Sequence, residues 1–269
     1  MSDPPDDDDR ESDVPDDAEE PDSEIAVEGR EPRAGPKVLP TIWPAPPSWP
    51  TVFGRSAPLE CELGFGRPHF ILERALEAPD HDIVGIEWKG RWPRAVWKKQ
   101  LTPVVLPRAP DGSTLTREAS SHSGAALRAS AGRPVEKGLL QYTNVRALHG
   151  NAWLLFGALF APSSLSLIVL NFPDPWWKSK HQKRRIVSDT FARLLASRLR
   201  IGGSILIQTD VASLLEEYLA RLEAQPTLTN PAGPFRLARK KPLGASSHRE
   251  KRCRADGVPI FRAVVERTS

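Results

Sequence analysis

From residue 59 onward, short apolar runs alternate with segments in which apolar side chains recur at helical spacing. Residues 59–65 and 82–88 are apolar runs of strand length, and the second is rich in β-branched side chains. Residues 69–78 lie between them and have an apolar helical face that contains Phe70, Ile71 and Leu76. Strand, glycine turn, helix and strand together make a βαβ unit, which predicts a parallel sheet.

The same alternation continues to the end of the chain. Further strands are predicted from residue 144, over 164–172, over 204–210 and over 258–268. A helix is predicted within 187–203, with an apolar stripe of Phe191, Leu194, Leu195 and Leu199 and an end at Gly202-Gly203. Another helix is predicted over 211–224, where Ser213 and Glu216 have the spacing of a capping box. This order predicts an α/β, doubly wound three-layer sandwich, mostly parallel, with an antiparallel strand at the C-terminus.

Three stretches interrupt the pattern. Residues 1–31 contain fifteen acidic side chains and two arginines, a composition typical of a disordered acidic tail. Residues 32–57 are rich in proline and tryptophan and are predicted to form an extended lead-in whose tryptophans dock on the body. Residues 102–137 show no sustained period and are predicted to be a mobile insertion in a domain that spans 58–269.

The charge distribution changes the picture of the whole chain. Residues 1–31 carry a net charge of −13, so the total of +3 leaves +16 on the other 238 residues. A body with this charge favours a polyanionic partner. The acidic start is unlike a signal peptide and no apolar run reaches membrane-spanning length, so we expect a cytoplasmic protein without membrane contact. Cys61 and Cys253 stand alone, which argues against a disulfide framework and against a metal site.

Candidate binding residues lie at the carboxyl ends of the predicted strands, where ligands bind in this fold class. Gly64 and Gly66 follow the first strand, but His69 stands where a dinucleotide fingerprint needs a third glycine. Glu87 ends the second strand at a position suited to ribose hydroxyls. Asn151 follows the next strand and would either meet an adenine edge or shape a turn. These features favour a nucleoside-bearing cofactor without a pyrophosphate loop.

The stretch NFPDPWWKSKHQKRR, residues 171–185, follows another strand. Two prolines hold Asp174 in a stiff turn, because proline fixes its own φ and restricts the preceding residue. Five basic residues follow closely: Lys178, Lys180, Lys183, Arg184 and Arg185. Trp176 and Trp177 would either stack on an RNA base or belong to the core. A carboxylate beside a basic run indicates a reactive site next to a nucleic-acid surface.

The motifs ELGFG, GIEW, NVRALHGNAW, NFPDPWWKSKHQKRR, QTD and SHRE, in this order, resemble the bacterial tRNA (guanine-N7)-methyltransferase family. The resemblance covers roughly residues 58–268, and FPDPW-x-K followed by HxKRR is its most specific part. It implies a Rossmann-like class I methyltransferase fold and transfer of a methyl group from S-adenosylmethionine to N7 of a guanosine in the variable loop of tRNA. Oligomeric state stays open between a monomer and a weak homodimer.

The resemblance also implies roles for single residues. The cofactor residues would be Glu62, Gly64, Gly66, Glu87, Asn151 and Asp174, and Asp174 would be catalytic. The substrate-binding residues would be Lys178, Asp210, Ser247 and Glu250. Lys180, Lys183, Arg184 and Arg185 are interpreted as RNA phosphate contacts.

Four features depart from the family pattern. Asn151 stands where the family usually has an aspartate, the Arg67-Pro68 turn lacks a further glycine, His248-Arg249 differ within SHRE, and the insertion is extra. Two alternatives therefore stay open. One is an RNA-binding relative that has lost catalysis, and the other is a methyltransferase acting on another RNA or on an adenine amine. Cofactor binding tests the first alternative, and the identity of the methylated nucleoside tests the second.

Overall fold

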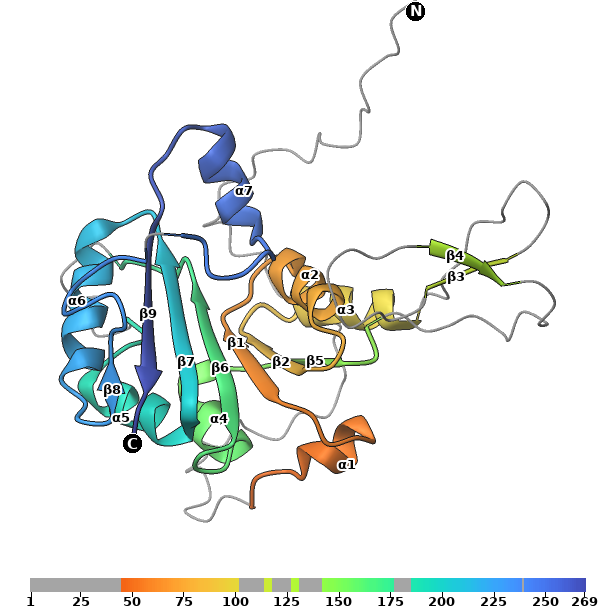
Figure 1. Cartoon of the computed structure of the whole chain (residues 1–269), viewed down its shortest axis with the longest axis horizontal. Helices are drawn as coiled ribbons and strands as arrows, with labels where there is room; N and C mark the ends of the chain where they lie inside the picture. The colour runs from red at the N-terminus through yellow and green to blue at the C-terminus, as the bar shows by residue number, and fades with distance from the viewer. Residues whose placement is uncertain (1–44, 102–113, 118–126, 131–141, 177–184, 239) are drawn as a thin grey trace, which may run out of the picture. The chain divides into compact units, whose positions relative to one another are not determined.

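The computed structural model describes residues 45–101, 114–117, 127–130, 142–176, 185–238 and 240–269. Within these ranges seven strands form one sheet in the order β5-β2-β1-β6-β7-β9-β8 (Figure 1). Their bounds are β1 Leu59–Leu63, β2 Asp82–Glu87, β5 Val145–His149, β6 Leu165–Asn171, β7 Leu199–Thr209, β8 Leu228–Thr229 and β9 Phe261–Arg267. The five strands from β5 to β7 are parallel, and β9 runs antiparallel to both β7 and β8. The predicted antiparallel C-terminal strand is confirmed.

Helices cover both faces of the sheet (Figure 1). Their bounds are α1 Trp49–Phe53, α2 His69–Glu77, α3 Arg91–Leu101, α4 Ala152–Leu159, α5 Asp189–Arg198, α6 Ala212–Glu223 and α7 His248–Ala255. The alternation of side chains along β1 divides the two faces. Cys61 and Leu63 pack with residues of α4, α5 and α6 in the largest core cluster, while Glu60 and Glu62 point to the opposite face. On that opposite face α2 packs over the sheet, because Phe70 contacts a cluster that contains Val169.

The order of the strands positions a binding site. From β1 the chain proceeds outward to β2 and then β5, and it returns to the other side of β1 at β6. Neighbouring strands that lead in opposite directions leave a crevice outside their carboxyl ends, where ligands bind in this class of sheet. The ends of β1 and β6 therefore mark the candidate site, with the ends of β2, β5 and β7 around it.

Two sequence predictions about helices were wrong. The lead-in was predicted to be extended throughout, but it contains α1, because Pro50 suits the first turn of a helix and Trp49 docks against Phe160. The predicted helix within 187–203 ends at Arg198, and Leu199 already begins β7. Gly203 belongs to the irregular start of β7 and does not end a helix. A glycine is needed at this position because a Cβ there would lie 2.9 Å from two backbone oxygens.

The predicted capping box of α6 was also wrong. Val211 is its N-cap and provides no side-chain hydrogen bond, whereas Thr209 Oγ1 accepts a 3.1 Å bond from the Val211 amide. Within the predicted insertion, the structure describes two antiparallel strands, β3 Thr114–Arg117 and β4 Leu127–Ser130, where no regular element was expected. Residues 1–31 lie outside the described residues.

Candidate active site

The glycine turn after β1 is tied to the end of β2. Gly64 and Gly66 have φ values of 70° and 53°, in the left-handed region that glycine adopts without strain. The Gly64 amide donates to Ile86 O at 2.8 Å, and the Gly66 amide donates to Glu87 Oε2 at 2.8 Å. No described atom lies within 4 Å of the position that a Cβ would take on either glycine. The turn thus presents bare backbone to an open space.

Glu87 is held in place by backbone amides. Its side chain is buried, Oε2 accepts the bond from Gly66, and Oε1 accepts a 2.7 Å bond from the Lys89 amide. A carboxylate has about four acceptor positions, so these two bonds leave capacity for hydroxyl donors. The Gly150 amide also donates to Glu87 O at 2.9 Å, which brings the end of β5 beside the end of β2.

Glu62 is a buried carboxyl group with one unused oxygen. Its Oε1 accepts a 2.7 Å bond from Asn171 Nδ2, while Oε2 is buried without a hydrogen-bond partner among the residues that the structure describes. Burial raises the pKa of Glu62 to about 8; the Asn171 hydrogen bond opposes this shift and the nearby Glu87 charge adds to it. A buried polar atom without a partner is costly, so Oε2 fits a donor supplied by a ligand.

Asn151 caps the helix that follows β5. Its Oδ1 accepts a 2.9 Å bond from the Trp153 amide at the start of α4. Of the two roles considered for this residue, shaping the turn is the one that the structure describes. An asparagine is well suited to an N-cap, because its short side chain satisfies a helix amide that has no partner within the helix.

The Pro-Asp-Pro turn follows β6 directly. Asp174 is exposed, and the residues that flank the turn, Phe172 and Trp176, have φ values of 48° and 46°. Such backbone conformations cost on the order of 1 kcal/mol or more for residues other than glycine, and they persist where the surroundings hold them. The Phe172 amide donates to Gln208 O at 2.7 Å on β7, so the start of the turn is fixed to the sheet.

Arg185 holds the other end of this turn. Its Nε donates to Pro175 O at 2.8 Å, and its Nη1 pairs with Glu217 on α6. The side chain is only 15% exposed. This differs from the predicted phosphate contact, because the guanidinium is already engaged within the protein. Trp177, Lys178, Lys180, Lys183 and Arg184 lie outside the described residues.

Three of the four predicted substrate residues, Asp210, Ser247 and Glu250, lie on α7, cap it or contact it. Ser247 is the N-cap of this helix, and its Oγ accepts a 3.1 Å bond from the Glu250 amide. Asp210 follows β7 and accepts two bonds from the Arg249 guanidinium, 3.2 Å from Nε and 2.5 Å from Nη2. The spacing S-x-x-E that suggested a substrate motif is therefore also the spacing of a helix cap.

Glu250 differs most from its predicted role. It is 0% exposed, and its Oε1 lies 3.2 Å from Lys241 Nζ, 2.7 Å from Arg254 Nη2 and 3.1 Å from Arg262 Nη2. A carboxylate enclosed by three cations has its charge satisfied within the protein without a substrate. In this structure Glu250 anchors α7 to the sheet.

Sequence reasoning missed three polar residues at this edge: Asn171, Gln208 and Arg262. The first two are buried and lie at the ends of apolar runs, and Arg262 donates to Gln208 Oε1 at 2.9 Å. A polar residue inside an otherwise apolar strand was the signal that could have found the first two.

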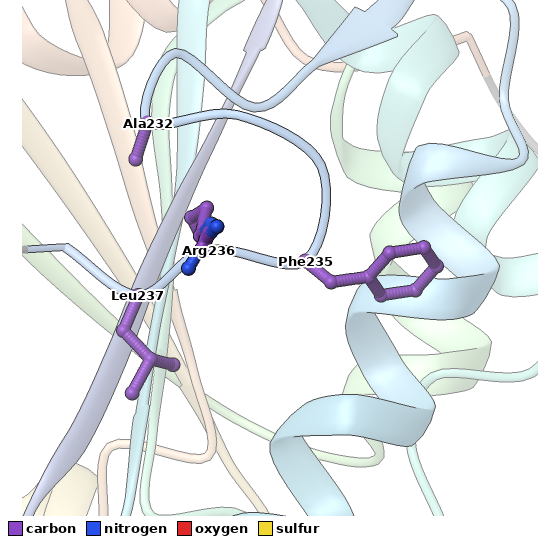
Figure 2. Close-up of a pocket in the computed structure, with 4 residues that line it drawn as sticks. All are labelled: Ala232, Phe235, Arg236 and Leu237. Atoms are coloured by element: carbon purple, nitrogen blue, oxygen red, sulfur yellow. The ribbon is translucent and has the colours of Figure 1, made fainter.

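Two surface hollows lie beside the loop between β8 and α7. One, of about 650 Å³, is lined by Ala232, Phe235, Arg236 and Leu237, and its Phe235 ring points away from the other three side chains (Figure 2). The other, of about 770 Å³, lies between this loop and residues of β6, β7 and β9 such as Leu167, Leu206 and Val264. Neither is lined by a predicted cofactor residue. The candidate site is therefore defined by the strand ends and their carboxylates.

Comparison with known proteins agrees with this arrangement. A family model described as "Putative methyltransferase" (Methyltransf_4) matches residues 56–263. The chain belongs to this methyltransferase family. The methyltransferase is 32% identical over 218 residues to the tRNA (guanine-N(7)-)-methyltransferase of Myxococcus xanthus strain DK1622, covering 81% of this chain and 87% of the relative. It is 33% identical over 224 residues to the protein of the same name from Synechococcus sp. strain JA-3-3Ab, covering 82% and 78%. The family resemblance predicted from the motifs is confirmed.

The fold is also confirmed by a solved structure. The methyltransferase resembles the crystal structure of the 16S rRNA methyltransferase KamB with a TM-score of 0.51 and 13% identity, over 82% of this chain and 93% of the other. At this identity the likeness establishes the class I methyltransferase fold alone.

Every helix in the described ranges is too short or too polar to cross a membrane.

Proposed function

We propose that this protein transfers a methyl group from S-adenosylmethionine to N7 of a guanosine in tRNA. The observation that carries the proposal is the exposed Asp174, held between two left-handed residues where β6 ends beside β1. A reactive carboxylate at this edge suits a cofactor and a base that meet there. The two relatives named tRNA (guanine-N(7)-)-methyltransferase supply the substrate of the proposal.

The residues present fit S-adenosylmethionine. Glu62 Oε2 is a buried oxygen without a partner among the described residues, and it would face a cationic group of the cofactor. Glu87 keeps acceptor capacity for ribose hydroxyls, and the Gly64–Gly66 turn leaves room for close approach. When bound, the cofactor supplies a methyl group on a positively charged sulfur. Asn151 completes the proposed cofactor residues from the end of β5, where its amide nitrogen is not used by the helix cap.

The proposed chemistry needs few catalytic groups. Guanine N7 carries a free lone pair and no proton, so the chain need not provide a general base. The base gains positive charge as it is methylated, and a fixed carboxylate lowers the energy of that change. Asp174 would do so from a turn whose ends are fixed by Gln208 O and by Arg185, with little reorganisation during the reaction.

The charge of the chain supports tRNA as the partner. Outside residues 1–31 the net charge is +16, and the run from Lys178 to Arg185 is the densest basic stretch beside the turn. We assign Lys178 to the substrate and Lys180, Lys183 and Arg184 to RNA phosphates. Asp210 and Ser247 position the substrate side through Arg249 and α7.

The test is nucleoside mass spectrometry of tRNA that lacks 7-methylguanosine, after incubation with purified protein and S-adenosylmethionine. Wild type should form 7-methylguanosine, and Asp174→Ala should lower the rate by about 100-fold or more, in the range of a lost electrostatic catalyst. Asp189→Ala is the matched control, because Asp189 is also an exposed aspartate, with a side chain 76% exposed on α5. It should leave the rate unchanged.

The product separates the alternatives. Methylated adenosine in place of 7-methylguanosine would replace the proposed reaction with amine methylation. Binding of tRNA without binding of S-adenosylhomocysteine, and without any methylated nucleoside, would identify an RNA-binding relative that has lost catalysis. If Asp174→Ala formed 7-methylguanosine at the wild-type rate, the proposed reaction would stand but Asp174 would have no catalytic role in it.

A further inference from the structure

Four neighbouring strands place polar side chains on one face of the sheet, near the edge at which β1, β6 and β7 end. These residues, the polar row, are Glu62 on β1, Asn171 on β6, Gln208 on β7 and Arg262 on β9. Asn171 is paired with Gln208 in the ladder, and Gln208 is paired with Arg262. Glu62 pairs with Val169, two residues before Asn171, so its side chain points to the same face.

Hydrogen bonds run through the polar row in one direction. Arg262 Nε donates to Gln208 Oε1 at 2.9 Å, Gln208 Nε2 donates to Asn171 Oδ1, and Asn171 Nδ2 donates to Glu62 Oε1 at 2.7 Å. Each amide accepts from one neighbour and donates to the next, so the row runs from a cation to a carboxyl group. Bonds in such a buried chain polarise one another, and a change at one end is felt at the other.

The far end of the polar row holds α7. Gln208 Nε2 also lies 3.4 Å from Glu250 Oε2, and Arg262 Nη2 donates to Glu250 Oε1 at 3.1 Å. Glu250 is fully buried, so these contacts, with the ion pair to Lys241, fix α7 over the sheet. The same helix is capped by Ser247, and its Arg249 pairs with Asp210, which follows β7.

We propose that Asn171 and Gln208 are positioning residues that couple Glu62 to α7, so that cofactor and tRNA each strengthen the binding of the other. This inference rests on the proposed function. Without a ligand, burial raises the pKa of Glu62 to about 8. A cationic cofactor group beside Glu62 Oε2 would favour the ionised carboxylate. The ionised group accepts a stronger bond from Asn171, and the row transmits this change to Gln208 and Glu250.

The first test needs no RNA. Hydrogen exchange of the α7 amides is measured with and without saturating S-adenosylhomocysteine, whose binding is checked by calorimetry. In wild type the ligand should slow α7 exchange about fivefold or more, the lower end of typical coupling between sites. Gln208→Met keeps the length of the side chain but removes its donors and acceptor, and it should abolish the ligand's effect on α7. Asn171→Leu cuts the row at the other joint and should behave in the same way.

Gln225→Met is the matched control. It makes the same chemical change two residues after α6, where Gln225 donates a 3.0 Å bond to Arg221 O, outside the polar row. It should keep the effect of S-adenosylhomocysteine on α7. Ligand protection of α7 that persists in Gln208→Met, or that is missing in wild type, would overturn the proposal.

The second test uses unmethylated tRNA. The Kd of S-adenosylhomocysteine should fall about fivefold or more in wild type when tRNA is present, and much less in Gln208→Met. If wild type methylates tRNA but shows neither coupling, the inference fails and the proposed function stands. If α7 responds to S-adenosylhomocysteine but no tRNA is bound or methylated, the proposed function fails, and only the link from Glu62 to α7 survives.

Discussion

The backbone amide of Gly66 donates a 2.8 Å hydrogen bond to Glu87 Oε2. This bond joins the turn after β1 to the end of β2, so one carboxylate shapes the glycine turn and also lies at the strand end where we propose that the cofactor binds. The two elements that define the proposed cofactor site are therefore not independent. A change in either residue should affect the other's contribution to binding.

Removing the Glu87 carboxylate should weaken cofactor binding strongly. Glu87→Ala loses at least one bond to a carboxylate, which contributes about 1.5–3 kcal/mol, so the Kd of S-adenosylhomocysteine should rise by roughly 10- to 150-fold or more. Calorimetric titration measures this change. Glu216→Ala, an exposed glutamate on α6, serves as the control and should bind like wild type. An unchanged Kd for Glu87→Ala would remove Glu87 from the cofactor site.

A methyl group on Gly66 should affect binding beyond its effect on stability. Gly66→Ala forces a side chain into a backbone with φ 53°, which costs on the order of 1 kcal/mol in stability. It also fills the open side of the turn. Gly54→Ala is the control, because it makes the same change at φ 73° beside α1, away from the proposed site. A Cβ on Gly54 would also have nothing within 4 Å. Both variants should melt earlier, and only Gly66→Ala should bind S-adenosylhomocysteine more weakly. Equal binding by the two would argue against close approach of the cofactor to this turn.

Glu62 should make the stability of the ligand-free protein fall as pH rises. Its pKa in the folded protein is raised by burial to about 8 from an ordinary 4.5, so the native state holds a proton that the unfolded state releases. The free energy of unfolding should therefore decrease between these two values, by up to about 1.4 kcal/mol per pH unit, and this contribution should be flat below and above them.

Comparison with Glu62→Gln isolates this effect from other titrating groups. Glutamine keeps the oxygen that accepts from Asn171 and cannot ionise, so the variant should lack this part of the slope. Urea unfolding at pH 5, 6, 7 and 8 gives the difference between the two proteins. Wild type should lose stability relative to the variant as pH rises. A constant difference across this range would contradict a raised pKa at Glu62.

Periodicity predicted the sheet well because its central strands are buried on both faces. All five residues of β1 and all six residues of β2 are buried, which is the pattern of a parallel strand between two layers of helices. The helix α7 was missed for the opposite reason. Its residues are nearly all polar, and it is held by the buried Glu250 and Cys253 and by ion pairs to other elements rather than by an apolar stripe.

The site was predicted in part, because strand ends can be located from sequence. Glu62, Glu87 and Asp174 all follow or end strands as expected. The polar row was not predictable in this way, since it depends on which residues of β6, β7 and β9 lie opposite one another. For the same reason Glu250 and Arg185 were interpreted as contacts to substrate and RNA, although each is paired within the protein.

Arg185 gives the sharpest test of a positioning role against a phosphate contact. A residue that binds an RNA phosphate contributes to the salt dependence of affinity, so its loss lowers the slope of log K against log salt by about 0.7–0.9. Arg185 instead joins Pro175 O to Glu217, and we expect Arg185→Ala to leave this slope unchanged while it lowers kcat for tRNA methylation. Fluorescence titrations of tRNA at several salt concentrations, with single-turnover rates, measure both quantities.

Glu217→Gln tests the same pair from the other side. Glu217 cannot attract a phosphate, and it holds Arg185 and also Arg221, whose Nη1 lies 2.7 Å from Glu217 Oε1. If Arg185 acts by fixing the end of the Pro-Asp-Pro turn, Glu217→Gln should lower kcat in the same direction as Arg185→Ala, with no loss of tRNA affinity. If Arg185 contacts RNA, releasing it from Glu217 should preserve or strengthen tRNA binding, and only Arg185→Ala should reduce the salt slope. Opposite effects of the two variants on tRNA affinity would therefore restore the phosphate contact that the sequence first suggested.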